Sequence, residues 1–145
     1  MKKLIGFAVV LIALFLSNNV FAQDRLTVSV SSGFGCSGTK HYEVASKDEI
    51  NKDGSPYFTW KDAGVACKNS NVDSKTGWSL PSKEVLKAMY EQLHEKGDGG
   101  FAYDYYWSSS EFDDGNAWGQ YFDFGLQDFV NKYNKYYRVR CVRAF

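Results

Sequence analysis

The sequence predicts an α+β domain in which two amphipathic helices precede a strand-rich C-terminal part. Two segments carry apolar residues at the spacing of one helix face, and each begins with a residue that can cap a helix. After residue 100 the composition changes, because the last 45 residues hold 15 of the 25 aromatic side chains. Several stretches there alternate apolar and polar residues, as half-buried strands do. Helices followed by strands, rather than alternating with them, indicate the α+β class.

Residues 1–22 are expected to be a secretory signal peptide and not part of the fold. Lys2 and Lys3 precede an apolar run over residues 4–16, and small residues surround a cleavage point after Ala22. The weaker alternative is an uncleaved anchor, since the run is shorter than the roughly 18–20 apolar residues of a spanning helix. We therefore expect a protein that is secreted or held in the cell envelope, with no membrane insertion of the mature chain.

The rest of the chain, residues 23–145, has a length that suits one domain. The first 22 residues contain two lysines and no acid, so the remainder carries 15 basic and 17 acidic residues and a net charge of −2. Such a balance gives no sign of binding to nucleic acid or to anionic membranes.

Residues 23–58 are expected to supply the first strands and loops of the domain. Residues 26–30 alternate in the manner of a strand, and residues 40–45 predict a second short one. A glycine-rich loop that carries Cys36 separates them, and Gly54 marks a turn in the polar stretch that follows.

The first helix is expected to begin at Thr59, whose hydroxyl can cap it, with Asp62 near the positive helix end. One face of this helix is predicted to contain Trp60, Ala63, Gly64 and Cys67. This spacing directs Cys67 inward.

A second helix is better marked. Ser82 is the expected N-cap, Glu84 lies in the first turn, and Gly97 ends the helix. Its buried face is predicted to be Val85, Leu86, Met89 and Leu93.

Two C-terminal stretches read as strands with one buried face. Residues 118–124 place Trp118, Gln120, Phe122 and Phe124 on one side. Residues 136–142 place Tyr137, Val139 and Cys141 on one side, with Arg138 and Arg140 opposite. The aromatic residues expected in the core are Trp107, Trp118, Phe122 and Phe124.

The three cysteines, Cys36, Cys67 and Cys141, predict one disulfide in an exported protein, with one thiol left over. The residues alone leave all three pairings open.

Five blocks, in this order, resemble the C-terminal domain family of Legionella collagen-like proteins, a domain of unknown function. They are TWKDAGVAC, GWSLPSKEVL, YYWSSSE, NAWGQYFDFG and YYRVRCVR. The resemblance runs from Thr59 to Arg143, so we take residues 59–145 as the family core. It implies a C-type-lectin-like fold, with two helices packed on a twisted antiparallel sheet and the chain ends brought together. It also implies a disulfide between Cys67 and Cys141, which leaves Cys36 free or specific to this subgroup.

Two residues depart from the family pattern. Ser79 stands where the family prefers Arg, and Val85 stands where it prefers Glu. If these two form an ion pair in relatives, both partners are replaced here and no lone buried charge remains. The departure argues against an essential charged role at either position.

Enzymatic chemistry finds little support in the sequence. Residues 108–110 are serines, but no nucleophile-elbow motif surrounds them, and only His41 and His94 could act as imidazole bases. We interpret His94 as an exposed cation at the end of the second helix. Formylglycine-generating enzymes have a related fold, but they look like much larger domains with a reactive cysteine pair. We expect a protein that is not an enzyme and has no cofactor.

A metal site is the less favoured interpretation of the acidic stretch at residues 111–116. Glu111, Asp113, Asp114 and Asn116 offer the hard oxygen ligands that calcium prefers. The spacing is not that of an EF-hand, and the signatures of calcium-dependent sugar-binding lectins are absent from the sequence. We favour a turn between two strands. Zinc lacks a suitable Cys/His cluster.

Three loops combine rigid aromatic area with adaptable polar groups, as binding surfaces do. The ligand-binding residues predicted in them are Tyr103, Asp104, Tyr105, Phe112, Asp113, Asp114, Asn116, Gln127, Asp128, Phe129, Asn131, Tyr133 and Asn134.

We therefore expect a non-enzymatic, adhesin-like binding module for a glycan or a cell-surface protein. The resemblance implies a glycan, because the best-known relatives are adhesins for sulfated polysaccharides. A polyanion needs a basic groove, however, and only Lys132, Lys135, Arg138, Arg140 and Arg143 gather near the end. Some lectin-fold relatives are diversified protein receptors, which is the alternative. The remaining alternative is a small secreted domain without a binding surface, in which the aromatic residues form the core and the loops are only solvated.

Overall fold

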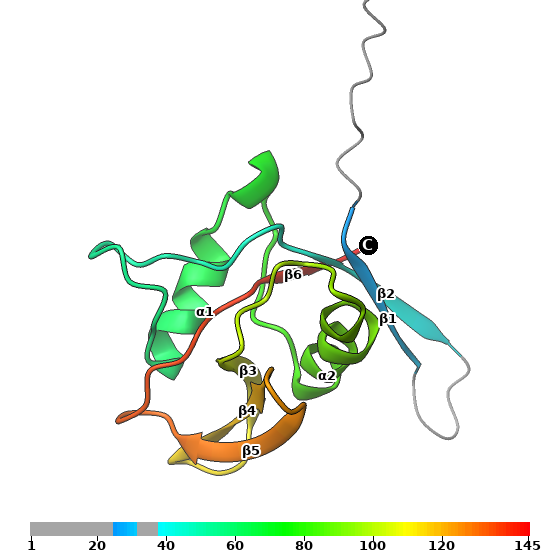
Figure 1. Cartoon of the computed structure of the whole chain (residues 1–145). Coiled ribbons are helices and arrows are strands. Elements are labelled where there is room, and N and C mark those ends of the chain that lie inside the picture. Colours follow the sequence, from blue (N-terminus) through cyan, green and yellow to red (C-terminus); the bar gives the residue numbers. More distant parts are fainter. Residues whose placement is uncertain (1–24, 32–37) are drawn as a thin grey trace, which may run out of the picture.

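Two α-helices and two three-stranded antiparallel sheets make up the fold (Figure 1). The structure is a computed structural model, and it describes residues 25–31 and 38–145. The signal peptide predicted at residues 1–22 and the loop residue Cys36 lie outside the described residues. The sequence-based prediction of an α+β class is confirmed, although the strands form two sheets instead of one.

The first sheet joins the two ends of the described chain. It contains β1 (Thr27–Ser31), β2 (Thr39–Val44) and β6 (Val142–Ala144) in the order β1-β2-β6. Both strands predicted near the N-terminus are confirmed. Because strand residues alternate between faces, Val28 and Val44 turn into the core, and Glu43 on the opposite face of β2 is buried among basic partners.

The second sheet is a meander of β3 (Tyr105–Glu111), β4 (Asn116–Tyr121) and β5 (Leu126–Asn131) in sequential order. The turn from β4 to β5 requires glycine at Gly125. Its φ is +71°, and a Cβ there would lie 2.4 Å from the ring of Tyr90.

The first helix begins as predicted. Helix α1 (Trp60–Asn69) is capped by Thr59, whose Oγ1 accepts a hydrogen bond from the backbone N–H of Asp62. A short 3₁₀ turn, η1 (Val72–Ser74), follows in the stretch predicted as a loop.

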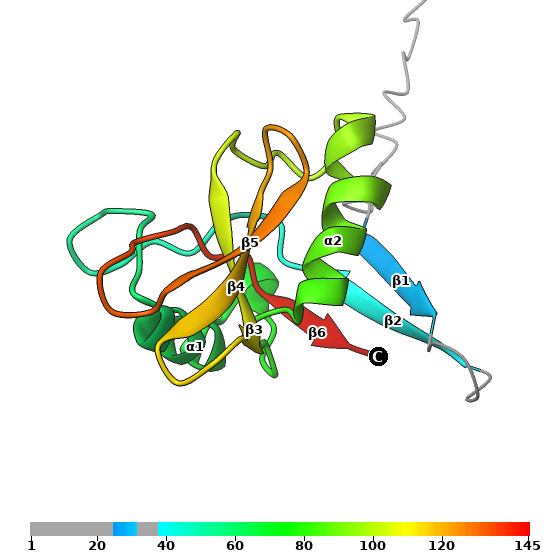
Figure 2. The ribbon, with the colours of Figure 1, turned by 90° about the horizontal axis from the view of Figure 1, so that it is seen from below.

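The second helix also follows its sequence signals. Helix α2 (Lys83–Gln92) is capped by Ser82, which accepts from the N–H of Val85, and it tightens into the 3₁₀ turn η2 (His94–Lys96). The left-handed Gly97, with φ +80°, ends the helical path. Helix α2 lies between the two sheets (Figure 2).

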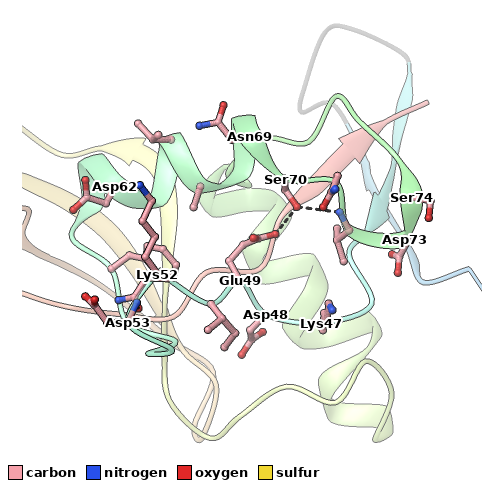
Figure 3. Close-up of a pocket in the computed structure, with 17 residues that line it drawn as sticks. Lys47, Asp48, Glu49, Lys52, Asp53, Asp62, Asn69, Ser70, Asp73 and Ser74 are labelled. Atoms are coloured by element: carbon pink, nitrogen blue, oxygen red, sulfur yellow. Dashed lines mark hydrogen bonds between the residues drawn. The ribbon is translucent and has the colours of Figure 1, made fainter.

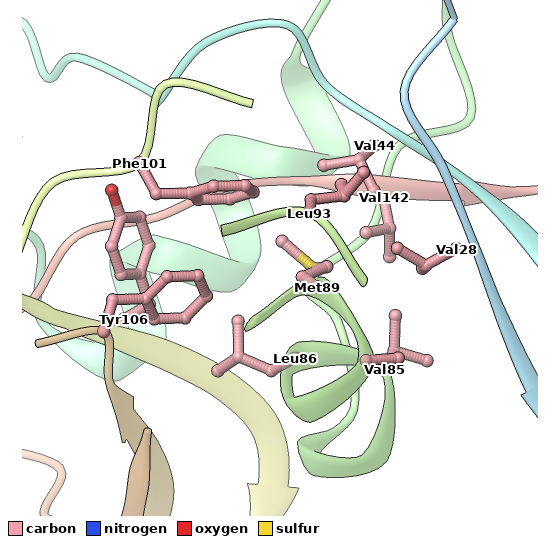
Figure 4. Packing of buried hydrophobic residues seen from close by; sticks show 11 residues of the cluster. Val28, Val44, Val85, Leu86, Met89, Leu93, Phe101, Tyr106 and Val142 are labelled. Carbon is pink, nitrogen blue, oxygen red and sulfur yellow. The ribbon is translucent and has the colours of Figure 1, made fainter. Parts of the chain in front are cut away.

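One core cluster fills the space around α2 (Figure 4). The predicted buried face of this helix is confirmed, and strands from both sheets cover it. The residues labelled there are Val28, Val44, Val85, Leu86, Met89, Leu93, Phe101, Tyr106 and Val142. Val85 is thus an apolar core residue.

A second core cluster surrounds a disulfide between Cys67 on α1 and Cys141, the residue before β6. The two Cα atoms are 5.5 Å apart, and 74 residues separate the cysteines in sequence. This pairing, implied by the family resemblance, is confirmed. Other members of the cluster are Ala45, Phe58, Ala63, Val72, Trp78, Leu80, Trp107, Ala117 and Val139.

The last predicted strand is shorter than expected and shifted. Residues 136–141 make only isolated bridges, Tyr137 with Phe58 and Arg138 with Tyr106, and a regular strand starts at Val142. The segment bridges first to Phe58, which lies outside both sheets, and then to Tyr106 of β3, and the chain joins the first sheet only at β6.

The prediction of solvated arginines opposite the core was wrong for Arg140, which is buried. Its Nε donates to Asp48 Oδ1 at 2.7 Å, and its Nη1 donates to the carbonyl oxygen of Gly99 at 2.7 Å. Arg138 bonds to the other Asp48 oxygen at 3.2 Å. Desolvation of Arg140 is offset because its hydrogen bonds and its ion pair are made inside the protein.

The prediction of a buried Phe124 was also wrong, because its side chain is 69% exposed. Strand β4 ends at Tyr121, so the alternation expected over residues 118–124 stops before Phe124 is reached. Trp107 and Phe122 are buried as predicted, and Trp118 is only partly buried.

His94 is not the exposed cation that we expected. It is half-buried, and its ring contacts Tyr90, Tyr103 and Phe122 at centroid distances of 5.5, 5.2 and 5.3 Å. The helix tightens at this point, which turns the imidazole toward the aromatic core.

Candidate ligand-binding surface

The predicted ligand-binding residues lie along the β3–β4–β5 sheet and at its two ends (Figure 2). The prediction of a loop was wrong for Gln127, Asp128 and Phe129, which belong to strand β5 and pair with β4. Residues 103–105 lie at the end where Tyr105 pairs with Tyr121. Residues 112–116 and 131–134 lie together at the other end, where Lys132 N–H donates to Gly115 O at 3.0 Å. The structure therefore brings two of the three predicted loops together and leaves the third apart.

The end near residue 105 is a stack of tyrosines. Tyr105 stacks on Tyr121 at 4.5 Å and on Tyr137 at 4.7 Å, so its ring faces are covered. Burial, with the carboxylates of Asp104 and Asp128 nearby, raises the pKa of Tyr137 to about 12. These rings brace the sheet and offer little free face to a ligand.

Asp104 has a structural role. Its Oδ2 accepts from Tyr57 Oη at 2.9 Å and from Arg138 Nε at 3.1 Å, which links the N-terminal loop to the last segment. Tyr103 next to it is exposed and contacts the ring of His94.

The turn between β3 and β4 is closed by Asp113. Its carboxylate accepts from the side-chain amide of Asn116 at 2.9 Å and from the N–H of Gly115 at 2.8 Å. These hydrogen bonds, the Asn116 side chain first among them, lower the pKa of Asp113. The turn interpretation of the acidic stretch agrees with this geometry.

An ammonium group occupies the position toward which the oxygens of this turn point. Lys132, only 5% exposed, donates from Nζ to the carboxylate of Glu111 and to the carbonyl oxygens of Asp113 and Asp114, the latter two at 2.8 and 3.2 Å. Its Nζ also lies 4.7 Å from the centroid of the Trp60 ring. Lys132 thus orders this loop in the way that a bound metal cation orders loops in other proteins.

Three aromatic side chains on the α2 side of the turn form what we call the aromatic patch: Phe112, Trp118 and Phe129. Phe112 and Phe129 are 50% and 43% exposed and stack at 4.0 Å, and Trp118 meets Phe112 edge-on at 5.8 Å. Lys83 at the start of α2 places its Nζ 4.4 Å from the Trp118 ring. Exposed rings that contact one another on a strand face are available for a partner.

On the α1 side of the same turn lies a pocket of about 440 Å³, which we call the Trp60 pocket. Tyr133, which is 68% exposed, forms one wall, and its hydroxyl donates to Asp114 O at 3.4 Å. Trp60 is held in place by a hydrogen bond from Nε1 to Ser108 O at 2.8 Å. The lining residues are Thr59, Trp60, Lys61, Asp62, Glu111, Asp114, Lys132 and Tyr133.

The other predicted residues of this region are engaged in local structure. Gln127 Nε2 donates to Lys83 O at 2.7 Å, and Asn131 Oδ1 accepts from the N–H groups of Tyr133 and Asn134, both at 2.9 Å. Asp128 and Asn134 have exposed side chains. Gln127 and Asn131 thus position the surface, whereas the patch and the pocket supply its free area.

A larger cleft, about 980 Å³, lies elsewhere, between residues 47–53 and helix α1 (Figure 3). Two of its carboxylates, Glu49 and Asp73, are held by internal partners. Ser70 donates to Glu49 at 2.6 Å, and the Ser46 N–H donates to Asp73 at 3.1 Å. Every residue that lines it lies outside the set predicted to bind ligand.

A third cavity, about 510 Å³, lies beside the buried carboxylate of Glu43. Arg25, Lys75 and Arg143 all form ion pairs with Glu43. Burial alone would raise the pKa of this group, but the three basic partners outweigh it and lower the pKa from 4.5 to about 2.

The serines Ser29 and Ser108 differ in exposure and in hydrogen-bond partner. Ser29 Oγ lies 2.8 Å from His41 Nδ1 on the exposed face of β1 and β2. Ser29 lies within strand β1 and not in the sharp turn of a nucleophile elbow. Ser108 is buried, and its Oγ donates to Trp118 O at 2.7 Å. Within residues 25–31 and 38–145, no group of three or more His, Cys, Asp or Glu side chains is placed to hold a metal ion.

Sequence reasoning missed the α1 contribution to this surface. Trp60 was placed on the inward face of the first helix, although it is only partly buried, Asp62 was placed near the positive helix end, and Lys132 was counted as one cation among several. The Thr59 cap was the available signal, because it fixes where the first turn of α1 presents its side chains.

Fold and surface together define a small, disulfide-linked α+β domain with an exposed aromatic surface at one end of its second sheet. The chain belongs to the Lcl C-terminal domain family, whose model matches residues 35–143. No curated protein gives a significant match to the chain. Among the residues that the structure describes, no helix has both the length and the apolar character needed to cross a bilayer.

Proposed function

We propose that this chain is an exported, non-enzymatic binding module that recognises a glycan through the surface around the β3–β4 turn. The observation that carries the proposal is the group of exposed rings on both sides of that turn, Phe112 and Phe129 on one side and Tyr133 on the other. Aromatic rings stack on the CH faces of sugars, and the neighbouring carboxylates and amides accept hydrogen bonds from hydroxyl groups.

The proposal includes a C-type-lectin-like fold. In support, the first and last strands share one sheet, two helices pack against the sheets, and Cys67 on α1 is bonded to Cys141 before the last strand. The bridge between Tyr106 of β3 and Arg138 ties the segment that leads into β6 to the second sheet.

The proposed glycan is not a polyanion. Of the five cations considered from the sequence, four have acidic partners: Lys132 pairs with Glu111, Arg138 and Arg140 pair with Asp48, and Arg143 pairs with Glu43. A sulfated chain needs unpaired basic groups along a groove. This charge pattern supports a ligand without strong negative charge.

A glycan array with the mature protein tests the proposal. We expect binding that chelator does not change, because Lys132 rather than a metal ion orders the turn. The double variant Phe112→Ala/Phe129→Ala should lower binding at least tenfold, while Phe124→Ala, an exposed ring at the other end of the sheet, should not. An array without any bound glycan, or equal loss in both variants, would rule the proposal out.

A protein receptor is the second candidate, and one observation favours it. Strand β5 pairs with β4 alone among the described residues, and Leu126 on it is exposed, so a partner strand could add to this edge. Treating a cell-surface preparation with protease or with periodate separates the candidates. Loss of binding after protease alone favours the receptor.

A further inference from the structure

The Trp60 pocket carries an inference about the chemistry of the ligand. Its volume, about 440 Å³, falls within the range of small-molecule sites, and the aromatic residues Trp60 and Tyr133 both belong to its lining. Trp60 is fixed by its hydrogen bond to Ser108, and Tyr133 by its contact with Asp114. The two rings can hold a flat ligand face without rearranging.

The free polar groups of this pocket are mainly acceptors. The ammonium of Lys132 is committed to Glu111 and to two backbone carbonyls. Asp114 uses its backbone carbonyl oxygen for these contacts, and it is an exposed residue of the pocket lining. Asp62 accepts one hydrogen bond, from the Thr59 hydroxyl at 2.7 Å. A ligand that fits must therefore bring donors.

The charge of the lining points the same way. Three carboxylates and two ammonium groups line the pocket, and one pair, Lys132 with Glu111, is neutralised within the protein. Asp62 and Asp114 then face a single lysine, Lys61, which is exposed on the first turn of α1. The balance is one negative charge, which attracts a cation and repels an acidic sugar.

We propose that the Trp60 pocket binds a sugar residue with a free amine, with its ring between Trp60 and Tyr133 and its ammonium group at Asp114. This inference rests on the proposed glycan-binding function and deepens it by naming the class of sugar. Sulfated and carboxylated sugars are disfavoured, because the lining keeps one net negative charge once Lys132 is paired with Glu111.

Isothermal titration calorimetry with three probes tests the inference: a chitosan oligosaccharide, the matching N-acetylated oligosaccharide, and heparin. The first two share one backbone and differ in the charged amine. At a pH where the amine is protonated, we expect the chitosan oligosaccharide to bind about fivefold more tightly than the acetylated one, as expected for one partly exposed ion pair. Added salt should narrow this difference, and heparin should not bind.

Asp114→Asn keeps the size and the hydrogen-bonding capacity of the side chain and removes its charge. This variant should equalise the affinities for the two oligosaccharides, and Tyr133→Ala should weaken both. Tyr136→Ala, an exposed ring of the same loop region outside the pocket, is the matched control and should change neither.

The outcomes separate the two proposals. If the acetylated oligosaccharide binds in a Tyr133-dependent manner but Asp114→Asn leaves the ratio unchanged, the amine inference fails and the glycan-binding function survives. Preferential binding of heparin overturns the inference as well. If none of the three probes binds and the glycan array is also empty, the proposed function itself fails.

Discussion

At the scale of single residues, Lys132 decides how the candidate surface is held. Its ammonium is nearly buried, and it collects one carboxylate and two carbonyl oxygens from the β3–β4 turn. An ammonium with three donors matches three converging acceptors, and its nitrogen lies 4.7 Å from the centroid of the Trp60 ring.

Replacing Lys132 with Met tests this role. The variant keeps the stem but leaves Glu111 and the two carbonyls without their donor, so we expect the free energy of unfolding to fall by about 1–3 kcal/mol. Urea unfolding measures the change. Lys135→Met is the control, because Lys135 is exposed in the same loop and its loss should cost less than about 0.5 kcal/mol. Equal stability of Lys132→Met and the wild type would contradict the role.

Pairings of this kind were beyond the reach of sequence reasoning. Asp48 lies in a polar stretch that reads as solvated loop, yet it bonds to Arg140, 92 residues further along the chain. Periodicity indicates which side of a helix or strand is apolar. It does not indicate which distant charged side chain forms an ion pair with a buried one. Alternation also failed where a strand ended, as Phe124 shows.

At the scale of elements, the helices were the most predictable parts. Their caps, Thr59 and Ser82, and the inward stripe of α2 follow from local chemistry alone. The strands of the second sheet were recognisable from alternation, but their arrangement was not. Which loops share an end of a meander depends on strand number and length, and that put Tyr105 at the end away from Phe112.

The disulfide links the element α1 to the last segment of the chain, and its removal is a second prediction. Cys67→Ala/Cys141→Ala should lower the free energy of unfolding by about 2–4 kcal/mol, because the unfolded chain loses its largest constraint. Thermal and urea unfolding give the difference. Cys36→Ser is the control, and a comparable loss in that variant would mean that the stability effect does not come from the bond.

At the scale of the whole molecule, stability should depend on acid through Glu43. The pKa of this group is lowered from 4.5 to about 2 in the folded state, so its contribution is complete above about pH 4.5 and is lost as the pH falls toward about 2. The shift corresponds to an upper value of roughly 3 kcal/mol. Urea unfolding at several pH values should show this decline.

Glu43→Gln provides the matched comparison for the acid effect. It retains the shape of the side chain and removes its titration, so the decline between about pH 4.5 and about pH 2 should flatten while stability at neutral pH falls. An unchanged pH profile in this variant would assign the acid sensitivity to other carboxylates.

The disulfide has a further consequence for a protein under tension. A pull on the two ends of the domain first loads β1 and β6, which lie in the same sheet. Once β6 peels away, the force passes through the covalent bond between Cys67 and Cys141, and the residues between them cannot extend. The ligand-binding residues predicted from Tyr103 to Asn134 all lie inside that closed loop. If the domain is stretched while a ligand is bound, its N-terminal part would therefore extend, and the predicted binding surface would keep its structure.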